Sequence, residues 1–259
     1  MSFCVSKVFH VFDIWSDFAC FKKNYATSSP QTFCFPPPSA IMGFCGCIVG
    51  DKWADFVKRY VSEIELGIQP QFDGQSGFAK IRMGMKLLIT KDVWNQAVYE
   101  GRKPFVSSPV PFELLYNPKY RVYLHCDSLR ERLGEMLRAH HSYFTPYLGM
   151  AQFIANFRYL GEFQFEEKNE GAALLKCVFI PPDKSEWSLD NSSSALYAQE
   201  RYPLLRSTNS DDPSLPERDV ERYVDCIVPL GKSPIKIMKG NYYSGDLNGI
   251  SASFSTIPV

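Results

Sequence analysis

The alternation of apolar and polar positions predicts strands at several places along the chain. Residues 8–15 form a nearly continuous β-forming run, which predicts a central strand buried on both faces. His10 and Asp13 interrupt this run, and we interpret both as hydrogen-bonded residues of the core or of the sheet rim. Residues 120–126 alternate clearly, which predicts a half-buried strand whose aromatic and basic outer face includes Tyr123.

A helix is predicted after the three prolines at 36–38. Proline rings hold the backbone extended there, and Ser39 follows as the expected N-cap. Apolar residues then recur at helical spacing on one face from Ile41 to Ile48. Residues 51–60 can continue as a second helical piece.

Three glycines lie on another face of this predicted helix. Gly43, Gly46 and Gly50 repeat at i, i+3 and i+7. A glycine inside a helix costs about 1 kcal/mol relative to alanine, so their spacing indicates that another backbone comes very close. Two interpretations stay open: tight packing of the helix on a sheet, and a polyanion laid across the helix start, where free N–H groups favour phosphate.

A second, clearer helix is predicted at residues 127–140. Ser128 and Glu131 have the spacing of a capping box at its start. Its apolar residues form one stripe that we expect to be buried: Leu129, Leu133, Met136 and Leu137.

The order of these elements predicts an α+β fold. The first two thirds read β, α, β, arm, β, α, β, which is the order of a ferredoxin-like, RNA-recognition-type (RRM-like) domain. We expect this domain to cover residues 1–170, with an inserted β-hairpin arm at about residues 70–115. Residues 171–259 are expected to form a smaller β-rich C-terminal portion with a polar loop at 183–219.

Within the C-terminal portion the pattern is weaker. Residues 171–181 predict one more strand, and residues 197–205 predict a short ordered piece inside the polar loop. Residues 223–229 and 235–243 are predicted to form a closing pair of strands, and residues 244–259 give no clear signal.

Composition narrows the class of protein. The 259 residues carry zero formal net charge, which argues against a protein wrapped in nucleic acid but is compatible with a basic groove on one face. Eight scattered cysteines without a CxxC pair predict reduced, mostly buried thiols in a cytoplasmic protein without a metal or other cofactor. No apolar run approaches the ~20 residues that a membrane-spanning helix needs.

Cations and tyrosines favour an interface with single-stranded RNA. Cationic side chains and backbone amides bind phosphates, and aromatic faces stack on splayed bases. The residues that the predicted fold would bring to one region are Lys22, Lys23, Arg82, Lys86, Arg102, Lys103, Arg121 and Arg158, with Tyr25, Tyr123, Tyr143 and Tyr147 between them. The alternative is a solvated rim of charges without a partner.

A metal-independent ribonuclease is a second hypothesis. His140 and His141 lie near Tyr143 and Tyr147 in the chain, and such groups could supply a general acid and base. The structural alternative is a pair of exposed histidines at a helix C-terminus, where their charge favours the helix dipole. The chain has no GxSxG, Walker A or GxGxxG motif.

A set of short motifs, in this order and spacing, resembles a known family. The motifs are FKK at 21–23, YATSSP at 25–30, FPPPSAIMG at 35–43, RMG at 82–84, PFELLYNPKYR at 111–121, TPYLG at 145–149, ANF at 155–157 and RYVD at 222–225. Together they are similar to the Cas-five subunit family (RAMP superfamily) of type I CRISPR effector complexes, also called Cascade, and most nearly to its type I-B branch.

This resemblance implies a fold and a role. The fold would be RRM-like, with a β-hairpin thumb and a reduced C-terminal portion. The subunit would cap the 5′ handle of the guide RNA (crRNA), contact the backbone and large subunits, and reach target DNA only through the guide duplex. A subunit of the type I-B branch would be non-catalytic. It would be located in the cytoplasm of a prokaryote and would not contact a membrane. A type I-C relative cleaves RNA with a tyrosine–lysine–histidine set, whose Lys-His pair this chain lacks.

The resemblance also implies which residues bind RNA. The leading positions belong to the first loop and the start of the first helix, and the others lie at the thumb base and after the second helix. They are Lys22, Lys23, Tyr25, Ser28, Ser39, Gly43, Gly46, Arg82, Lys86, Tyr147 and Gln152.

Overall fold

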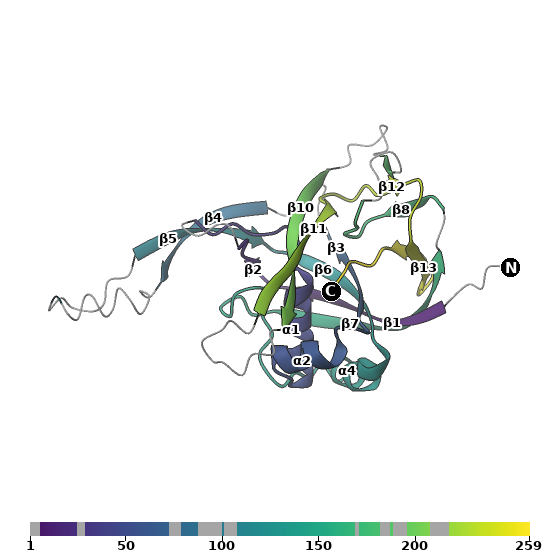
Figure 1. The fold of residues 1–259 in the computed structure, drawn as a ribbon, viewed down its shortest axis with the longest axis horizontal. Helices are drawn as coiled ribbons and strands as arrows, with labels where there is room; N and C mark the ends of the chain where they lie inside the picture. The colour runs from purple at the N-terminus through teal and green to yellow at the C-terminus, as the bar shows by residue number, and fades with distance from the viewer. Residues whose placement is uncertain are drawn as a thin grey trace.

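The structure is a computed structural model of the chain (Figure 1). It describes residues 6–24, 29–72, 79–87, 100, 108–168, 171–181, 187–188, 196–207 and 218–259. In these residues it is an α+β fold made mostly of strands, and no helix there is long and apolar enough to cross a membrane. Their seven cysteines are free thiols, and all but Cys47 are buried, as predicted.

A six-stranded antiparallel sheet forms the centre of the molecule. Its strands are, in spatial order, β14 (Ile250–Phe254), β13 (Tyr242–Leu247), β7 (Asn156–Lys168), β1 (Ser6–Trp15), β6 (Lys119–His125) and β3 (Glu65–Pro70). The predicted central strand is confirmed, because β1 pairs on both sides and its middle is buried on both faces. Leu66 of the edge strand β3 forms a further bridge with Ile257, which follows the opposite edge strand β14. The sheet therefore curls so that its two edges come together.

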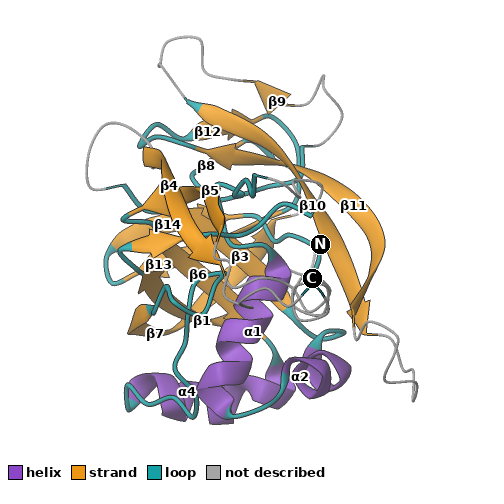
Figure 2. Ribbon diagram, turned by 90° about the vertical axis from the view of Figure 1, so that its left-hand side faces the viewer, coloured by secondary structure: helices purple, strands orange, loops and turns teal. Residues whose placement is uncertain are grey.

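Helices cover one face of this sheet: α1 (Pro38–Val49), α2 (Trp53–Tyr60) and α4 (Arg130–Arg138) (Figure 2). The predicted apolar stripe of α1 is buried, with Ile41 and Ile48 each at most 1% exposed. The predicted N-cap at Ser39 is wrong, because Pro37 takes the capping position and makes no side-chain cap. Proline suits the first helical position, so α1 begins at Pro38 and Ser39 lies inside its first turn.

The capping box predicted for the second helix is also wrong. A short 3₁₀ turn, η1 (Asp127–Leu129), precedes α4, and neither element has a side-chain cap. The Ser128 N–H instead donates to the Glu63 carboxylate at 3.3 Å, so the loop before β3 satisfies this donor. The buried stripe itself is present, with Met136 only partly buried.

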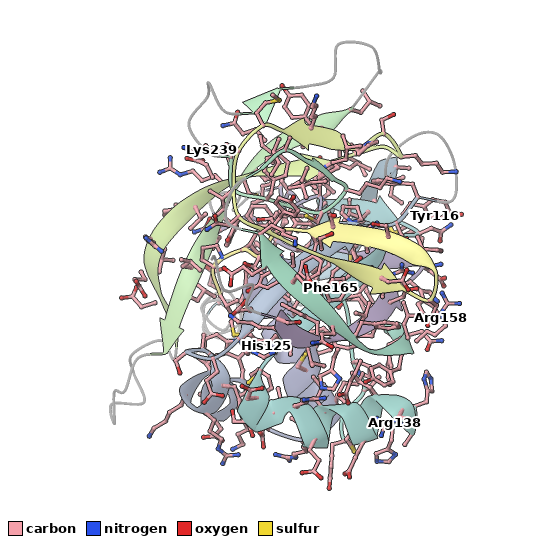
Figure 3. The ribbon with its side chains drawn as sticks, turned by 90° about the vertical axis from the view of Figure 1, so that its right-hand side faces the viewer. Tyr116, His125, Arg138, Arg158, Phe165 and Lys239 are labelled. Atoms are coloured by element: carbon pink, nitrogen blue, oxygen red, sulfur yellow. The ribbon has the colours of Figure 1, made fainter. Side chains whose placement is uncertain are left out.

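Strands cover the other face of the sheet, which corrects a second prediction. Tyr123 was expected on an outer face, yet it is 1% exposed and its ring stacks on Phe254 with centroids 4.1 Å apart. Phe9 belongs to this second core, as does Phe165, which is labelled in Figure 3. A small sheet made of β8 (Ala173–Leu175), β12 (Ile235–Ile237) and β9 (Trp187–Ser188) closes over it. β8 is much shorter than the strand predicted at 171–181.

A two-stranded ribbon joins β10 (Tyr197–Ser207) and β11 (Arg218–Pro229) (Figure 2). The ordered piece predicted at 197–205 is therefore confirmed as a full strand. The closing pair predicted from 223–229 and 235–243 is wrong, because β11 pairs with β10 and β12 pairs with β8 and β9. The inner face of the ribbon carries Tyr202 and Cys226, which pack into the same core as α1.

The last residues belong to the central sheet. β14 and most of β13 lie within the stretch that gave no clear signal, and β13 pairs with β7. The pairing of β13 with β7 thus connects the two sides of the boundary expected between residues 170 and 171. The core that contains the buried face of α1 also includes residues from both sides of this boundary.

A third sheet holds β2 (Phe18–Ala19), β5 (Ser108–Tyr116) and β4 (Ala79–Leu87) in the order β2-β5-β4. β4 and β5 pair antiparallel and extend to one side of the central sheet (Figure 1). The connection between them, apart from Glu100, lies outside the described residues, and with it the candidates Arg102 and Lys103.

Candidate nucleic-acid interface

A hollow of about 430 Å³ lies beside the start of α1. Three segments line most of it: the stretch after β2, the exposed side of α1, and the loop that follows α4. The connection from α1 to α2 adds Asp51, Lys52 and Trp53. Four predicted binding residues meet there, namely Lys22, Ser39, Gly43 and Tyr147. Its volume is in the range typical of small-ligand sites, and its lining mixes apolar and polar side chains.

Backbone contacts hold the three segments together. The Cys20 N–H donates to the Leu148 carbonyl at 3.3 Å, which joins the stretch after β2 to the loop after α4. The Tyr143 and Phe144 N–H groups donate to carbonyls of Ile48 and Cys47 at 3.3 and 3.1 Å. These carbonyls belong to the last turn of α1, which leaves its carbonyl groups without partners inside the helix. The walls of the hollow are therefore fixed by the main chain.

The hollow carries unbalanced positive charge. Lys22 and Lys52 line it and are exposed, and neither has an ion-pair partner among the described residues. Asp51 also lines it, but Arg59 and Arg132 each approach its carboxylate at 3.3 Å. Because these two arginines neutralise Asp51, the remaining cations favour an anionic ligand.

Aromatic side chains lie around the same hollow. Tyr147 is 42% exposed and Phe144 is 55% exposed, and Trp53, at the start of α2, also lines the hollow. The sequence reasoning had not selected Phe144, Trp53 or Lys52. Exposed aromatic side chains beside cations are the arrangement on which single-stranded bases stack.

Lys23 does not share the hollow, contrary to its predicted role. Its Nζ lies 2.6 Å from Glu200 Oε2, and the two side chains are only 12% and 6% exposed. Lys22 and Lys23 are neighbours in an extended segment, so their side chains point to opposite sides. Only Lys22 faces outward.

Gly46 does not line the hollow either. A Cβ there would lie 2.9 Å from the carbonyl oxygen of Asp51 and 3.8 Å from the Phe56 side chain. The close backbone that the glycine spacing indicated is thus the protein's own connection to α2. Gly43, whose Cβ would lie 3.8 Å from Trp53, remains half-buried at the hollow.

The other predicted residues are separate from the hollow. Arg82 is exposed on β4, and Gln152 is exposed after the loop at 145–149. Lys86 lies in β4, and its side chain is outside the described residues. Tyr25 and Ser28 also lie outside the described residues.

His10 and His125 are bonded within the protein, whereas His140 and His141 are exposed, and the His141 ring lies 6.1 Å from the Tyr143 ring between centroids. Burial lowers the pKa of His10, which contacts the Tyr159 hydroxyl and the Arg130 carbonyl, each at 2.9 Å. His125 contacts the Val8 carbonyl at 2.8 Å. His140 is exposed and stacks on Phe157, with centroids 4.4 Å apart, and it does not line the hollow.

Asp13 is the other buried polar residue of β1. Arg121 donates to it from Nε at 2.8 Å, and Arg158 donates from Nη2 at 2.8 Å. Burial alone would raise the pKa of this carboxyl, but the two guanidinium groups hold it below its ordinary value. Arg121 and Arg158, both candidates for RNA contacts, are therefore engaged within the protein, although Arg158 lies at the periphery (Figure 3).

A comparison with solved structures matches this chain to several CRISPR proteins. One is described as "Crystal structure of a CRISPR protein from Archaeoglobus fulgidus" (11% identity, TM-score 0.48, 96% of this chain and 99% of that chain). A second is a chain described as "CRISPR RNA-guided surveillance complex" (14% identity, TM-score 0.45, 87% of this chain and 91% of that chain). A third is described as "Cryo-EM structure of the Type III-B Cmr-beta bound to cognate target RNA and AMPPnP, state 1" (12% identity, TM-score 0.42, 87% of this chain and 86% of that chain). All three TM-scores lie below 0.5, so we rest nothing on them.

The sequence itself gives the stronger finding. A search among curated proteins finds no match. The family model described as "CRISPR-associated protein (Cas_Cas5)" matches residues 10–220, which contain the residues that line the hollow, most of the central strand β1, and the helices α1, α2 and α4. Since this match covers well over half of the chain, the chain belongs to the Cas5 family of CRISPR-associated proteins.

Proposed function

We propose that this chain is a non-catalytic subunit of a type I CRISPR effector complex, most like type I-B, that binds the 5′ handle of the guide RNA. One observation carries the proposal: the hollow beside α1 brings Lys22, Ser39, Gly43 and Tyr147 together from three segments of the chain. Cations for phosphate and aromatic faces for bases are what a splayed single strand requires.

The fold supports the same proposal. Strands β7, β1, β6 and β3 are adjacent in this order, α1 lies between β1 and β3 in the chain, and α4 lies between β6 and β7. This order supports the proposal that the first part of the chain is a ferredoxin-like, RRM-like domain with helices on one face. We further propose that the β4–β5 pair serves as the thumb, and that backbone and large subunits are the protein partners.

The arrangement of the histidines supports a non-catalytic role. A general base must reach the proton that it abstracts, within about 3 Å or through one water. His10 is buried and bonded, and neither His140 nor His141 lines the hollow. The ribonuclease alternative requires His140 or His141 to act without the hollow.

Binding is tested with the full chain and a 5′-labelled single-stranded RNA that copies the repeat of its own CRISPR locus. Lys22→Glu is expected to weaken binding at least about tenfold, because it reverses a charge in the hollow. Lys58→Glu is the matched control, since Lys58 is equally exposed but lies on α2 outside the hollow. Equal affinities would refute the site, and a wild-type chain that binds no RNA would refute the function.

Catalysis is tested by incubating the same RNA with the protein in EDTA and running a denaturing gel. Intact RNA is the expected result. A discrete cut that disappears in His140→Ala or His141→Ala would establish the ribonuclease instead.

A further inference from the structure

The first loop, residues 22–32, has two described stems, residues 22–24 and 29–32, which pair with each other. Lys22 and Thr32 form an antiparallel bridge, and the Lys23 N–H donates to the Gln31 carbonyl at 2.8 Å. One step further in, the Phe33 N–H donates to the Phe21 carbonyl at 2.9 Å. Both stems of the loop are thus fixed, and the question is what holds them against the rest of the molecule.

On one side the β10–β11 ribbon holds the loop. The buried Lys23–Glu200 ion pair connects the incoming stem to β10, and the Lys23 ammonium also lies 5.2 Å from the centroid of the Phe33 ring. The next residue continues the contact, because Asn24 Nδ2 donates to the Tyr223 hydroxyl of β11 at 2.6 Å.

On the other side the β4–β5 pair holds the loop. Glu113 of β5 accepts the Thr32 N–H at 3.2 Å and the Lys80 ammonium at 3.0 Å. Lys80 of β4 also donates to the Thr32 carbonyl at 3.2 Å. The Glu113 N–H donates to the Pro30 carbonyl at 2.9 Å, so main chain and side chain act together.

We propose that Glu200 and Glu113 are positioning residues which clamp the two described stems of the first loop, residues 22–24 and 29–32, from both sides and so hold these stems in position for RNA. Lys23 belongs to this clamp and does not bind phosphate, whereas Lys22 faces the hollow. The proposal rests on the proposed RNA-binding function. It gives the β10–β11 ribbon, which comes partly from a segment expected to be loop, a specific role in that function.

The physical basis is pre-organisation. A loop held in its bound geometry loses less conformational entropy when a ligand binds. An ion pair this deeply buried is sensitive to the loss of one partner, since the remaining charge then lacks its neutralising carboxylate away from water. Removal of the Glu200 charge should therefore release the Lys23 stem even though Glu200 is not expected to touch RNA.

The experiment compares Glu200→Gln with Glu221→Gln, a control on the same ribbon whose side chain is exposed. Amide hydrogen exchange of peptides spanning residues 21–33 is measured on the RNA-free full chain. Affinity for the labelled repeat RNA is measured over a series of salt concentrations. Glu200→Gln is expected to speed exchange and to lower affinity about tenfold with an unchanged salt slope, and Glu221→Gln is expected to change neither.

A second variant, Lys23→Met with Glu200→Gln, removes both charges and avoids an unpaired one. Its salt slope should equal that of the wild type, whereas loss of one phosphate contact would reduce the slope by about 0.7. A reduced slope would show that Lys23 binds phosphate, and wild-type exchange and affinity in Glu200→Gln would refute the clamp. The exchange readout needs no RNA, so a chain that binds no RNA refutes the proposed function while exchange still decides whether Glu200 holds the loop.

Discussion

Gly149 and Cys20 touch through their backbones. A Cβ at position 149 would lie 1.9 Å from the Cys20 carbonyl oxygen, and Gly149 has a φ of +85°. Only glycine accepts that conformation without strain and leaves that space. The contact joins the loop after α4 to the stretch after β2, and so it sets one wall of the hollow.

Gly149→Ala is therefore expected to lower the free energy of unfolding by about 2–4 kcal/mol, because it adds both backbone strain and a clash with main-chain atoms. Urea denaturation measures the change. Gly84→Ala is the control, since nothing lies within 4 Å of a Cβ at that position, and its effect should stay within about 0.5 kcal/mol. Equal stabilities of the two variants would contradict the close approach.

Asp13→Asn is expected to lower the free energy of unfolding by about 2–3 kcal/mol at pH 7. The carboxylate is 1% exposed and neutralises two guanidinium groups, although the 59% exposure of Arg158 lets water screen part of the loss. The same variant should keep its fold by far-UV circular dichroism at pH 7.

The effect has a defined pH dependence. The folded-state pKa of Asp13 lies below its ordinary value of 3.8, so its contribution is complete above that value. The contribution is lost as the pH falls through the folded-state pKa. Urea titrations at pH 7, 5 and 3 should show the difference between wild type and Asp13→Asn shrink only at the lowest pH. A constant difference would argue against an ionised Asp13.

Local patterns predicted the parts of the fold that depend on local physics. The apolar run at 8–15 could be identified as a central strand because both of its faces are buried, and the stripe from Ile41 to Ile48 faces the core as its helical spacing requires. The helix starts were less predictable. Pro38 at the first helical position displaced Ser39, and Glu63, from a different part of the chain, took the N–H of Ser128.

Long-range pairing could not be predicted in this way. The alternation around Tyr123 correctly predicts a strand, but it does not reveal that β14 brings Phe254 onto its outer face. The last residues form β13 and β14 although they are rich in serine and glycine, because β7 offers them an edge to pair with. Their stability comes from that edge and from the second core, which no local pattern encodes.

The candidate site was predicted in part. Lys22, Ser39, Gly43 and Tyr147 come together, whereas Lys23 turns inward to Glu200. Which of two adjacent lysines faces the hollow depends on the register of the Lys22–Thr32 bridge, which is a tertiary feature. Phe144 and Trp53 were missed because single aromatic residues in a sequence are more often part of a core.

Tyr147→Ala is expected to weaken binding of the labelled repeat RNA about 5- to 150-fold, as base stacking on an aromatic side chain is worth about 1–3 kcal/mol. Tyr147→Phe keeps the ring and should stay within about threefold of the wild type. Fluorescence anisotropy measures both. Tyr197→Ala is the control, because Tyr197 has a similar exposure of 39% but lies on the ribbon. A loss in Tyr147→Phe as large as in Tyr147→Ala would indicate that the hydroxyl group, and not stacking, carries the contact.

Cys47 offers a test of RNA occupancy without a substitution in the hollow. It lines the hollow and is the one described cysteine that is not buried, although its partial burial still raises the pKa of its thiol. It should therefore be alkylated by N-ethylmaleimide at pH 8.5 faster than the buried Cys45, whose thiol pKa is raised much further. Site-resolved mass spectrometry follows both rates.

Saturating repeat RNA should slow alkylation of Cys47 at least about tenfold, because an occupied hollow excludes the reagent. The alkylation rate then follows the fraction of the protein that is free of RNA. In Lys22→Glu the same RNA concentration should give little protection, since that variant binds weakly. Protection of Cys47 that is equal in wild type and Lys22→Glu would mean that the RNA reaches it by another route, and no protection of wild type by bound RNA would place the RNA elsewhere on the molecule.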